Sequence, residues 1–197
     1  MKYLSLFRNN FEKRSTFTIS EVKKVLGQKK ISAGYVNTLL NHLSKKGEIK
    51  RITKGVYTFK NEIEVVGFAF PPFYYGLQEA LSLRKMWDQE TNPVVITSRK
   101  IRTGIRKFLG NNYLIKRINR KMFFGFEMIQ YYDMWIPVSD LEKTLIDFVY
   151  FKLPINQEVL ADIKKQIKTK RLDGYLNKAP KWVKRRVRKV LGKSSTF

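Results

Sequence analysis

Residues 32–46 read SAGYVNTLLNHLSKK, and this stretch decides how the first part of the chain is interpreted. Its apolar residues recur at spacings of three and four, the pattern of one buried face of an α-helix. The Ser32 hydroxyl can accept a hydrogen bond from a free amide of the first turn, so we expect the helix to begin after it. The predicted buried face consists of Ala33, Val36, Leu39, Leu40 and Leu43.

The opposite side of this predicted helix carries no acidic residue. At about 100° per residue, the residues on that side are Gly34, Thr38, Asn41 and Lys45, flanked by Tyr35, Asn37 and His42. A purely structural surface helix usually mixes Glu with Lys, whereas short hydrogen-bonding groups suit a helix that lies in a DNA major groove. The pattern therefore favours a recognition helix.

The flanking residues complete a predicted winged helix-turn-helix over residues 1–61. Apolar residues of 3–11 predict a first helix. Thr18 and Glu21 form a capping box that opens a second helix, which Gly27 can end. Residues 49–59 alternate around Lys54-Gly55 and predict a β-hairpin, the wing. Many winged helices bind proteins, so docking of a protein partner is the alternative that this fold leaves open.

The charge of the chain points to a polyanionic partner. Its 197 residues contain 40 Lys and Arg against 16 Asp and Glu, a net charge of +24. Residues 1–60 hold 14 basic and 3 acidic residues, 61–150 hold 12 and 10, and 151–197 hold 14 and 3. A general excess of basic residues would not favour the two ends in this way.

The sequence lacks the residues that several functional classes require. There is no cysteine, which excludes disulfides, thiolate catalysis and Cys-based metal sites. His42 is the single histidine, so we do not expect a His-ligated zinc, nor any other metal or cofactor. No apolar run approaches the roughly 20 residues that span a bilayer, and no signal peptide is recognisable. We therefore expect a soluble, cytoplasmic protein with no membrane partner.

Residues 62–152 predict a small antiparallel α+β domain. Strands are expected at 64–70, 94–97 and 135–138, an antiparallel pair at 113–118 and 122–129, and a helix at 75–86. Ser139 and Glu142 have the spacing of a second capping box, which opens a helix through Phe151. Glu142 is explained by this cap and Asp147 by an i, i+4 pair with Lys143, so we predict structural rather than catalytic roles for these groups.

Residues 153–197 predict a basic helical segment, either separate or part of the second domain. One helix is expected at 155–168 and another after Pro180, with Val183, Val187, Val190 and Leu191 on its apolar side. A second basic surface is predicted from Arg99, Lys100, Arg102, Arg106, Lys107, Lys184, Arg185 and Arg188. The basic helix after Pro180 could meet DNA backbone, RNA or an acidic protein, or its charges could simply be solvated; its narrow apolar stripe disfavours a membrane surface.

Five segments in order resemble the AbiEi family of antitoxins over residues 1–155. They are KGVYTF, YYGLQEALSL, NPVVITSRK, FFGFEMI and VSDLEKTLIDFVYF. The resemblance implies a DNA-binding autorepressor that binds inverted repeats in its own promoter and is the antitoxin of a type IV toxin-antitoxin operon. It also implies a nucleotidyltransferase-like AbiEii toxin as partner and a C-terminal region tied to antitoxicity. A stand-alone transcriptional regulator, or a protein- or RNA-binding module that neutralises a toxin, is the alternative.

The DNA-binding hypothesis assigns roles to ten residues of this region. The residues expected to read base edges are Thr38, Asn41, Tyr35 and His42. The residues expected to hold the DNA backbone are Lys29, Lys30, Ser32, Lys45, Arg51 and Lys54. A palindromic operator requires two copies, which associate either in solution or only on DNA. No phosphate-binding loop or nucleotidyltransferase motif is present, so we do not expect an enzyme.

Overall fold

The computed structural model describes residues 3–28, 31–87, 89 and 91–192. The chain is a mixed α+β protein with two compact units, Met1–Pro71 with Lys107–Asn111, and Pro72–Arg106 with Asn112–Phe197. The first unit thus extends about ten residues beyond the boundary that we placed after residue 61. Within the described ranges, no helix has both the length and the apolar character needed to cross a bilayer.

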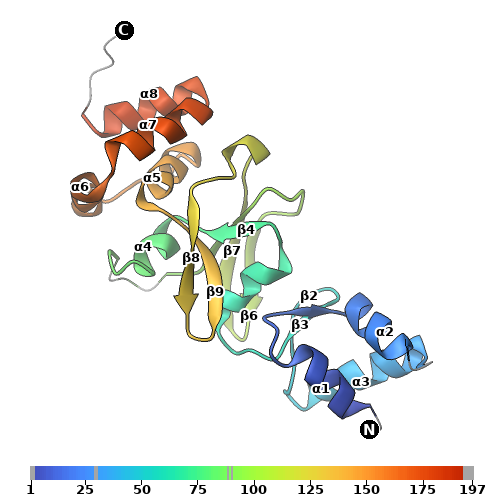
Figure 1. Cartoon of the computed structure of the whole chain (residues 1–197). Coiled ribbons are helices and arrows are strands. Elements are labelled where there is room, and N and C mark those ends of the chain that lie inside the picture. The colour runs from blue at the N-terminus through green and yellow to red at the C-terminus, as the bar shows by residue number, and fades with distance from the viewer. Residues whose placement is uncertain (1–2, 29–30, 88, 90, 193–197) are drawn as a thin grey trace. The chain divides into compact units, whose positions relative to one another are not determined.

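The first unit combines three helices with a small antiparallel sheet (Figure 1). Its sheet has the strand order β1-β3-β2, with β3 in the middle. The elements are, in order, α1 (Leu4–Phe11), β1 (Phe17–Thr18), α2 (Ile19–Gly27), α3 (Ala33–Lys45), β2 (Lys50–Thr53), β3 (Val56–Thr58) and the 3-10 helix η1 (Ile63–Ala69).

Local signals in the sequence set the ends of these helices. The Thr18 hydroxyl accepts a hydrogen bond from the backbone amide of Glu21, whose carboxylate accepts one from the Thr18 amide, which confirms the predicted capping box. Ser32 caps α3 as predicted, by accepting from the Tyr35 amide at 3.2 Å. At the turn of the β2–β3 hairpin, Gly55 has φ +77°, a conformation that glycine adopts without strain.

Aromatic and aliphatic side chains fill the core of the first unit. Phe7 and Phe17 are buried with ring centroids 5.3 Å apart, and α2 contributes the buried Val22 and Leu26. Burial of each such side chain contributes about 1.5–3 kcal/mol. From α3, the buried residues are Val36, Leu39, Leu40 and Leu43. Ala33 was also predicted to be buried, but it is exposed because it begins the helix beyond the reach of the core.

The second unit is built on one six-stranded sheet with the order β6-β7-β5-β4-β9-β8. Strands β4 and β5 are antiparallel, as are β8 and β9, whereas β4 with β9 and β5 with β7 are parallel. The strands are β4 (Phe73–Tyr75), β5 (Val94–Thr97), β6 (Gly104–Phe108), β7 (Asn111–Arg117), β8 (Phe126–Tyr131) and β9 (Met134–Ser139). The sheet is therefore mixed, and the prediction of an antiparallel domain was wrong.

Three further predictions for this region were wrong. The expected pairing of 113–118 with 122–129 does not form, because β5, β4 and β9 lie between β7 and β8. The expected strand 64–70 is η1, since a continuous apolar run has no period that distinguishes a strand from a buried helical turn. The expected helix 75–86 begins as strand β4, and only α4 (Gln78–Ser82) is helical, because Leu77 has φ +60° between them.

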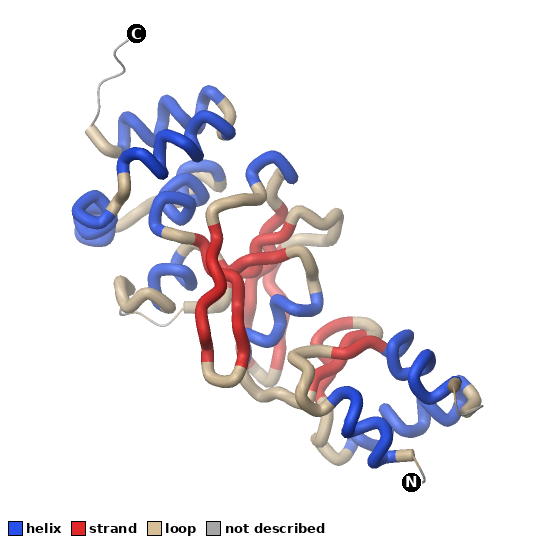
Figure 2. Tube along the Cα trace, in the orientation of Figure 1, coloured by secondary structure: helices blue, strands red, loops and turns tan. Residues whose placement is uncertain are grey.

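Four helices gather together beside the strands of the second unit, as the blue segments of Figure 2 show. They are α5 (Leu141–Tyr150), α6 (Gln157–Gln166), α7 (Thr169–Lys178) and α8 (Lys181–Val190). Helices α6, α7 and α8 all pack on α5, and Leu160, Leu172 and Val183 enter its apolar core. Residues 153–190 are therefore part of the second unit. Helix α7 was not predicted, because only Leu172 and Leu176 of its ten residues are buried.

A polar network lies inside this core. Asp140, not Ser139, caps α5 by accepting from the Lys143 amide, so the predicted capping box is one residue out of register. Glu142 instead accepts from the Lys168 amide at 2.7 Å. The predicted Lys143–Asp147 ion pair is present and wholly buried, and the Tyr74 hydroxyl donates to Asp147 at 2.9 Å. Burial raises the pKa of Asp147 and lowers the pKa of Lys143.

We expect Lys143→Met to lower the free energy of unfolding by about 3–5 kcal/mol, because it leaves the buried Asp147 carboxylate without its cation. Stability of this variant should also fall with rising pH, since a carboxyl whose pKa is higher in the folded than in the unfolded state favours folding only when protonated. The double variant Lys143→Met/Asp147→Leu should recover most of the loss. Urea titrations measure this, and a double variant as unstable as the single one would contradict it.

Candidate nucleic-acid interface

Helix α3 separates its residues into a buried and an exposed face, as its sequence predicts. Gly34, Asn37, Thr38, Asn41, His42 and Lys45 are exposed. Among the described residues, the side chains of Asn41 and His42 have no hydrogen-bond partner and remain available to a ligand. The Thr38 hydroxyl donates to the Gly34 carbonyl at 3.1 Å, which leaves its oxygen free to accept.

Tyr35 is the exception among the four predicted base-reading residues. Its ring packs edge-on against Tyr3, with the centroids 5.8 Å apart, and it contacts the core of the first unit. Its hydroxyl oxygen is buried and has no partner in the described part of the chain. The hydroxyl is therefore not presented on the exposed face of α3, and the assigned role of Tyr35 in reading bases stays a prediction. The helical projection placed Tyr35 on the flank between the two faces of α3, where a residue can be either buried or exposed.

The predicted backbone-contacting residues lie on three elements of the first unit. Lys45 is exposed near the end of α3, and Ser32 is exposed at its start. Arg51 on β2 and Lys54 at the hairpin turn are also exposed, and the Arg51 Nε donates to the Thr53 carbonyl at 3.3 Å. Lys29 and Lys30 lie outside the described residues.

Within the described residues of the first unit, the ion pairs do not involve the side chains of α3. Arg8 binds Glu48 at 2.5 Å, and Arg14 binds Glu21 at 3.4 Å. These pairs neutralise two of the few acids in the first sixty residues. Within the described part of this unit, the exposed basic residues without a carboxylate within 4.0 Å include Lys23, Lys24, Lys45, Lys46, Arg51 and Lys54. The first unit therefore retains a positive surface beside the uncharged groups of α3.

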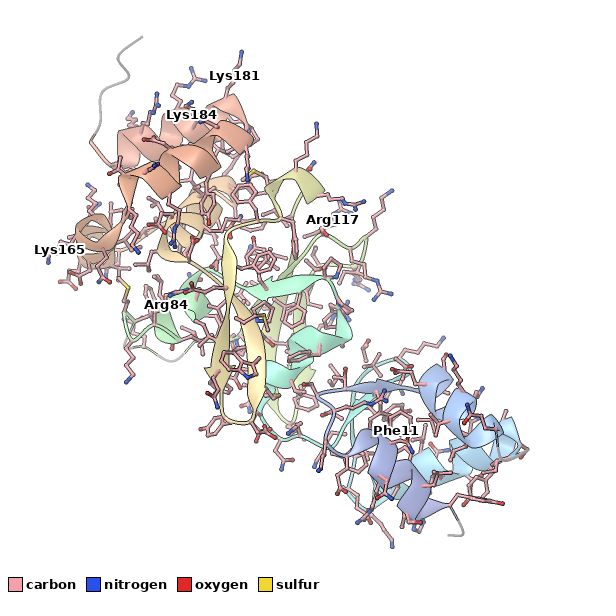
Figure 3. All side chains as sticks on the ribbon, in the orientation of Figure 1. Phe11, Arg84, Arg117, Lys165, Lys181 and Lys184 are labelled. Atoms are coloured by element: carbon pink, nitrogen blue, oxygen red, sulfur yellow. The ribbon has the colours of Figure 1, made fainter. Side chains whose placement is uncertain are left out.

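The predicted second basic surface consists of two groups on separate elements. Arg99, Lys100 and Arg102 are exposed on the loop between β5 and β6, and Lys107 is exposed on β6. Arg106 is half-buried and donates to the Arg102 carbonyl at 2.9 Å. Arg185 is exposed on α8, whereas Lys184 and Arg188 are half-buried, and Lys184, labelled in Figure 3, donates to Asn177.

Two buried acids of the second unit, Asp140 and Glu142, serve structural contacts. Asp140 caps α5 and accepts a 2.7 Å hydrogen bond from the Tyr175 hydroxyl. Burial, together with this hydrogen bond, raises the pKa of Tyr175 to about 12. Arg171 lies 3.6 Å from Asp140 and 3.8 Å from Glu142. Among the described residues, no group of three or more His, Asp or Glu could hold a metal ion.

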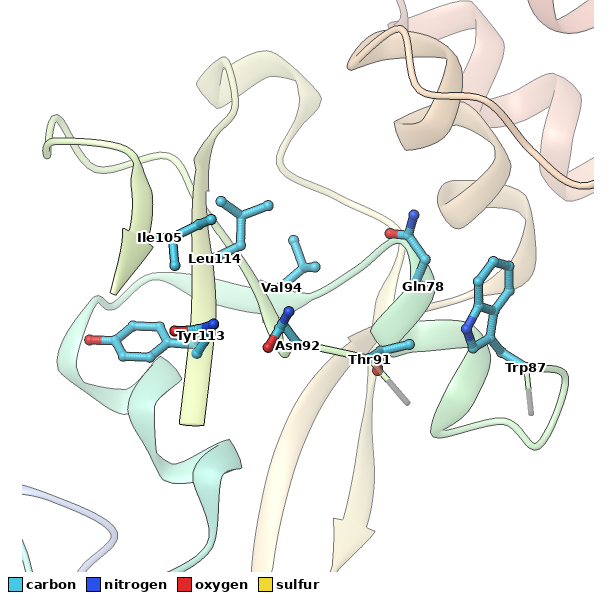
Figure 4. A pocket seen from close by; sticks show the side chains of 9 residues that line it. Gln78, Trp87, Thr91, Asn92, Val94, Ile105, Tyr113 and Leu114 are labelled. Carbon is cyan, nitrogen blue, oxygen red and sulfur yellow. The ribbon is translucent and has the colours of Figure 1, made fainter. Parts of the chain in front are cut away.

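One pocket of the second unit was not anticipated from any motif. It has a volume of about 270 Å³ and lies between α4 and the strands β5, β6 and β7 (Figure 4). Its lining residues come from separate parts of the sequence and are mostly amides and apolar groups, which gave no pattern that sequence reasoning could detect. The lining residues are Gln78, Trp87, Thr91, Asn92, Val94, Ile105, Asn112, Tyr113 and Leu114.

Comparisons with known proteins inform the fold. No family model matches the chain, and the search of curated proteins also found no match. Among solved structures, the chain is similar to the RV2827C protein from Mycobacterium tuberculosis, with a TM-score of 0.63 and 12% sequence identity. The similarity covers 93% of this chain and 73% of that one. At this level of identity the likeness concerns the fold alone.

We expect Ser32→Ala to lower the free energy of unfolding by about 1 kcal/mol, because it removes the acceptor that caps α3. Ser32→Asp is the matched control, since its carboxylate can accept the same amide hydrogen and should retain wild-type stability. Urea denaturation followed by circular dichroism measures both. Equal destabilisation by the two substitutions would show that the hydroxyl has no capping role.

Proposed function

We propose that the chain is a sequence-specific binder of double-stranded DNA and a transcriptional repressor. The observation that carries the proposal is the exposed face of α3, which offers hydrogen-bonding groups and no carboxylate. Phosphate repels acidic side chains, whereas short amide and hydroxyl groups can bind base edges in the major groove. The exposed lysines and arginines of the same unit supply the charge that attracts a duplex.

The order of elements supports a winged helix-turn-helix as the fold of the first unit. That motif places a recognition helix second in a pair of crossed helices and follows it with a β-hairpin. Here α2 and α3 are packed on each other, and β2 and β3 form the hairpin. In the proposed complex, Thr38, Asn41 and His42 face base edges, while Ser32, Lys45, Arg51 and Lys54 bind phosphates.

We further propose that this repressor is an antitoxin of the AbiEi type that acts in the cytoplasm on its own promoter. The resemblance of five ordered segments supports this, as does the concentration of positive charge in residues 1–60 and 151–197. A palindromic operator would be bound by two copies. An adjacent gene for a nucleotidyltransferase-like toxin would be the matching partner, and the chain itself is proposed to be no enzyme.

We expect Asn41→Ala to weaken binding to the operator by about 1–3 kcal/mol while leaving binding to a scrambled duplex unchanged, because the amide is proposed to pair with adenine. Lys54→Ala should weaken binding to both duplexes alike and reduce the salt dependence by about one phosphate contact. Fluorescence anisotropy at several salt concentrations, with duplexes from the promoter, measures this. Asn61→Ala and Lys121→Ala, both at exposed sites, are the controls.

Ser32→Asp adds a test that separates binding from folding. Its carboxylate can maintain the cap of α3 but places negative charge beside the proposed phosphate position. Operator affinity should fall while the stability of the protein is kept. Equal losses on operator and scrambled DNA for Asn41→Ala, or full operator affinity for Ser32→Asp, would contradict the proposed orientation of α3.

The second candidate function is binding of RNA, or of an acidic toxin surface, by α8. Val183 and Val187 of this helix are buried, while Lys181, Arg185, Arg186 and Lys189 are exposed. Arg185→Glu/Lys189→Glu reverses two charges that are four residues apart and lie on one side of α8. We expect at least a tenfold loss of affinity for structured RNA with unchanged operator affinity. Arg120→Glu/Lys121→Glu, at two exposed positions outside the predicted second basic surface, is the control, and an equal effect of both pairs would indicate only general electrostatic attraction.

A further inference from the structure

Strand β8 forms one edge of the six-stranded sheet, and its outer side carries no strand. The sheet order ends with β4-β9-β8, and within the described residues β8 pairs with β9 alone. The two strands keep an unbroken antiparallel register, from Phe126 opposite Ser139 to Tyr131 opposite Met134, and Figure 1 shows them side by side. This edge therefore has no bulge that would keep another strand away.

The register shows which backbone groups of β8 point away from the sheet. The Asp140 amide donates to the Gly125 carbonyl at 2.9 Å, and Met128 lies opposite Pro137, which has no amide to donate. Hydrogen-bonded and non-hydrogen-bonded pairs alternate along an antiparallel ladder. The residues whose backbone groups point outward, where a further strand can bind them, are therefore Phe126, Met128 and Gln130.

The two edges of this sheet differ in charge. The other edge strand, β6, carries Arg106 and Lys107, and positive side chains commonly keep edge strands from pairing with another chain. Strand β8 has no basic residue and no proline, and its single acid, Glu127, binds Arg84 at 2.7 Å. Residues 122–142 contain no Lys or Arg, although the chain has 40 of them. Two copies with a net charge of +24 each can therefore approach with least repulsion at this hairpin.

Exposed apolar side chains gather on the β8–β9 hairpin. Met128 has 52% of its surface exposed, Trp135 has 58%, and Tyr132 at the turn has 74%. Met128 lies opposite Pro137 and Gln130 lies opposite Trp135, so Met128 and Trp135 are diagonal neighbours on one face of the sheet. Apolar groups beside an unpaired strand edge favour association, because pairing of the edge removes them from water.

We propose that the chain forms a dimer in which the β8 strands of two copies pair antiparallel and join the two sheets into one. An antiparallel pair of identical strands has a twofold axis, so one edge serves both copies. The register that pairs the outward groups places Met128 of each copy opposite the other on this axis. Glu127 then lies opposite Ile129 of the second copy, so the two carboxylates do not meet. The dimer forms without DNA and does not depend on the proposed operator binding.

Sedimentation equilibrium of the full-length protein, without DNA, tests this association. At about 0.1 mM protein, where a dimer with a micromolar Kd is largely formed, we expect a mass twice that of one chain. Met128→Lys should restore the monomer, because two ammonium groups then face each other across the axis. Ile105→Lys is the matched control, since Ile105 is also an exposed apolar residue of an edge strand but lies on β6. It should dimerise as the wild type does.

Disulfide trapping tests the register. The chain has no cysteine, so a single introduced one can form only an intermolecular bond. Met128→Cys should link two chains on oxidation, because opposed residues of a hydrogen-bonded pair have Cα atoms about 5.5 Å apart, within the range of a disulfide. Gln130→Cys, on the same strand and face, is the control, since its two copies would be offset by about 13 Å along the strands. Non-reducing gel electrophoresis measures both.

Three results would overturn the proposal. A wild-type protein that stays monomeric at the highest concentration leaves the edge of β8 to a strand of another protein. Dimerisation of Met128→Lys as strong as that of the wild type, with the fold of the variant confirmed by circular dichroism, shows that the interface lies elsewhere. Linking of Gln130→Cys as fast as that of Met128→Cys excludes the proposed pairing.

Discussion

Burial of four aliphatic side chains fixes the rotation of α3 about its own axis. Val36, Leu39, Leu40 and Leu43 enter the core with α1 and α2, so the helix cannot turn without exposing them. The direction in which the side chains of its other face point is thereby fixed by the core. The proposed reading of DNA depends on this constraint, since base recognition requires that amide and hydroxyl groups be presented at fixed positions.

A different constraint organises the second unit. Helix α5 carries the buried Lys143–Asp147 pair, and Tyr74 on β4 joins it to the sheet. The Lys143 ammonium also lies 5.1 Å from the centroid of the Phe124 ring, which partly replaces the water that burial removes. Only glycine fits at position 125 beside this ion pair, because a Cβ there would lie 2.8 Å from the Lys143 Cβ and the residue has φ +72°. A buried charge with this many partners specifies one arrangement of helix and sheet.

The first unit followed from its sequence far better than the second. Capping residues, amphipathic periodicity and a glycine turn are local signals, and they located α2, α3 and the β2–β3 hairpin. The order of strands in the mixed sheet depends on contacts between distant residues, which periodicity does not encode. Among candidate site residues, Asn41 and Lys54 are exposed as the proposed roles require, whereas Tyr35 is held by the core. The pocket of Trp87 and Asn112 is assembled from several elements and has no sequence signature.

The packing of α6, α7 and α8 around α5 has a consequence for biosynthesis. The first unit has most of its core once residue 71 has left the ribosome, but the core of the second unit lacks Val183 and Val187 until α8 has emerged. Between the emergence of β9 and that of α8, a nascent chain therefore holds a closed amino-terminal unit and a sheet with exposed apolar surface. A nonsense codon between residues 140 and 180 would leave that surface uncovered and expose the product to proteolysis.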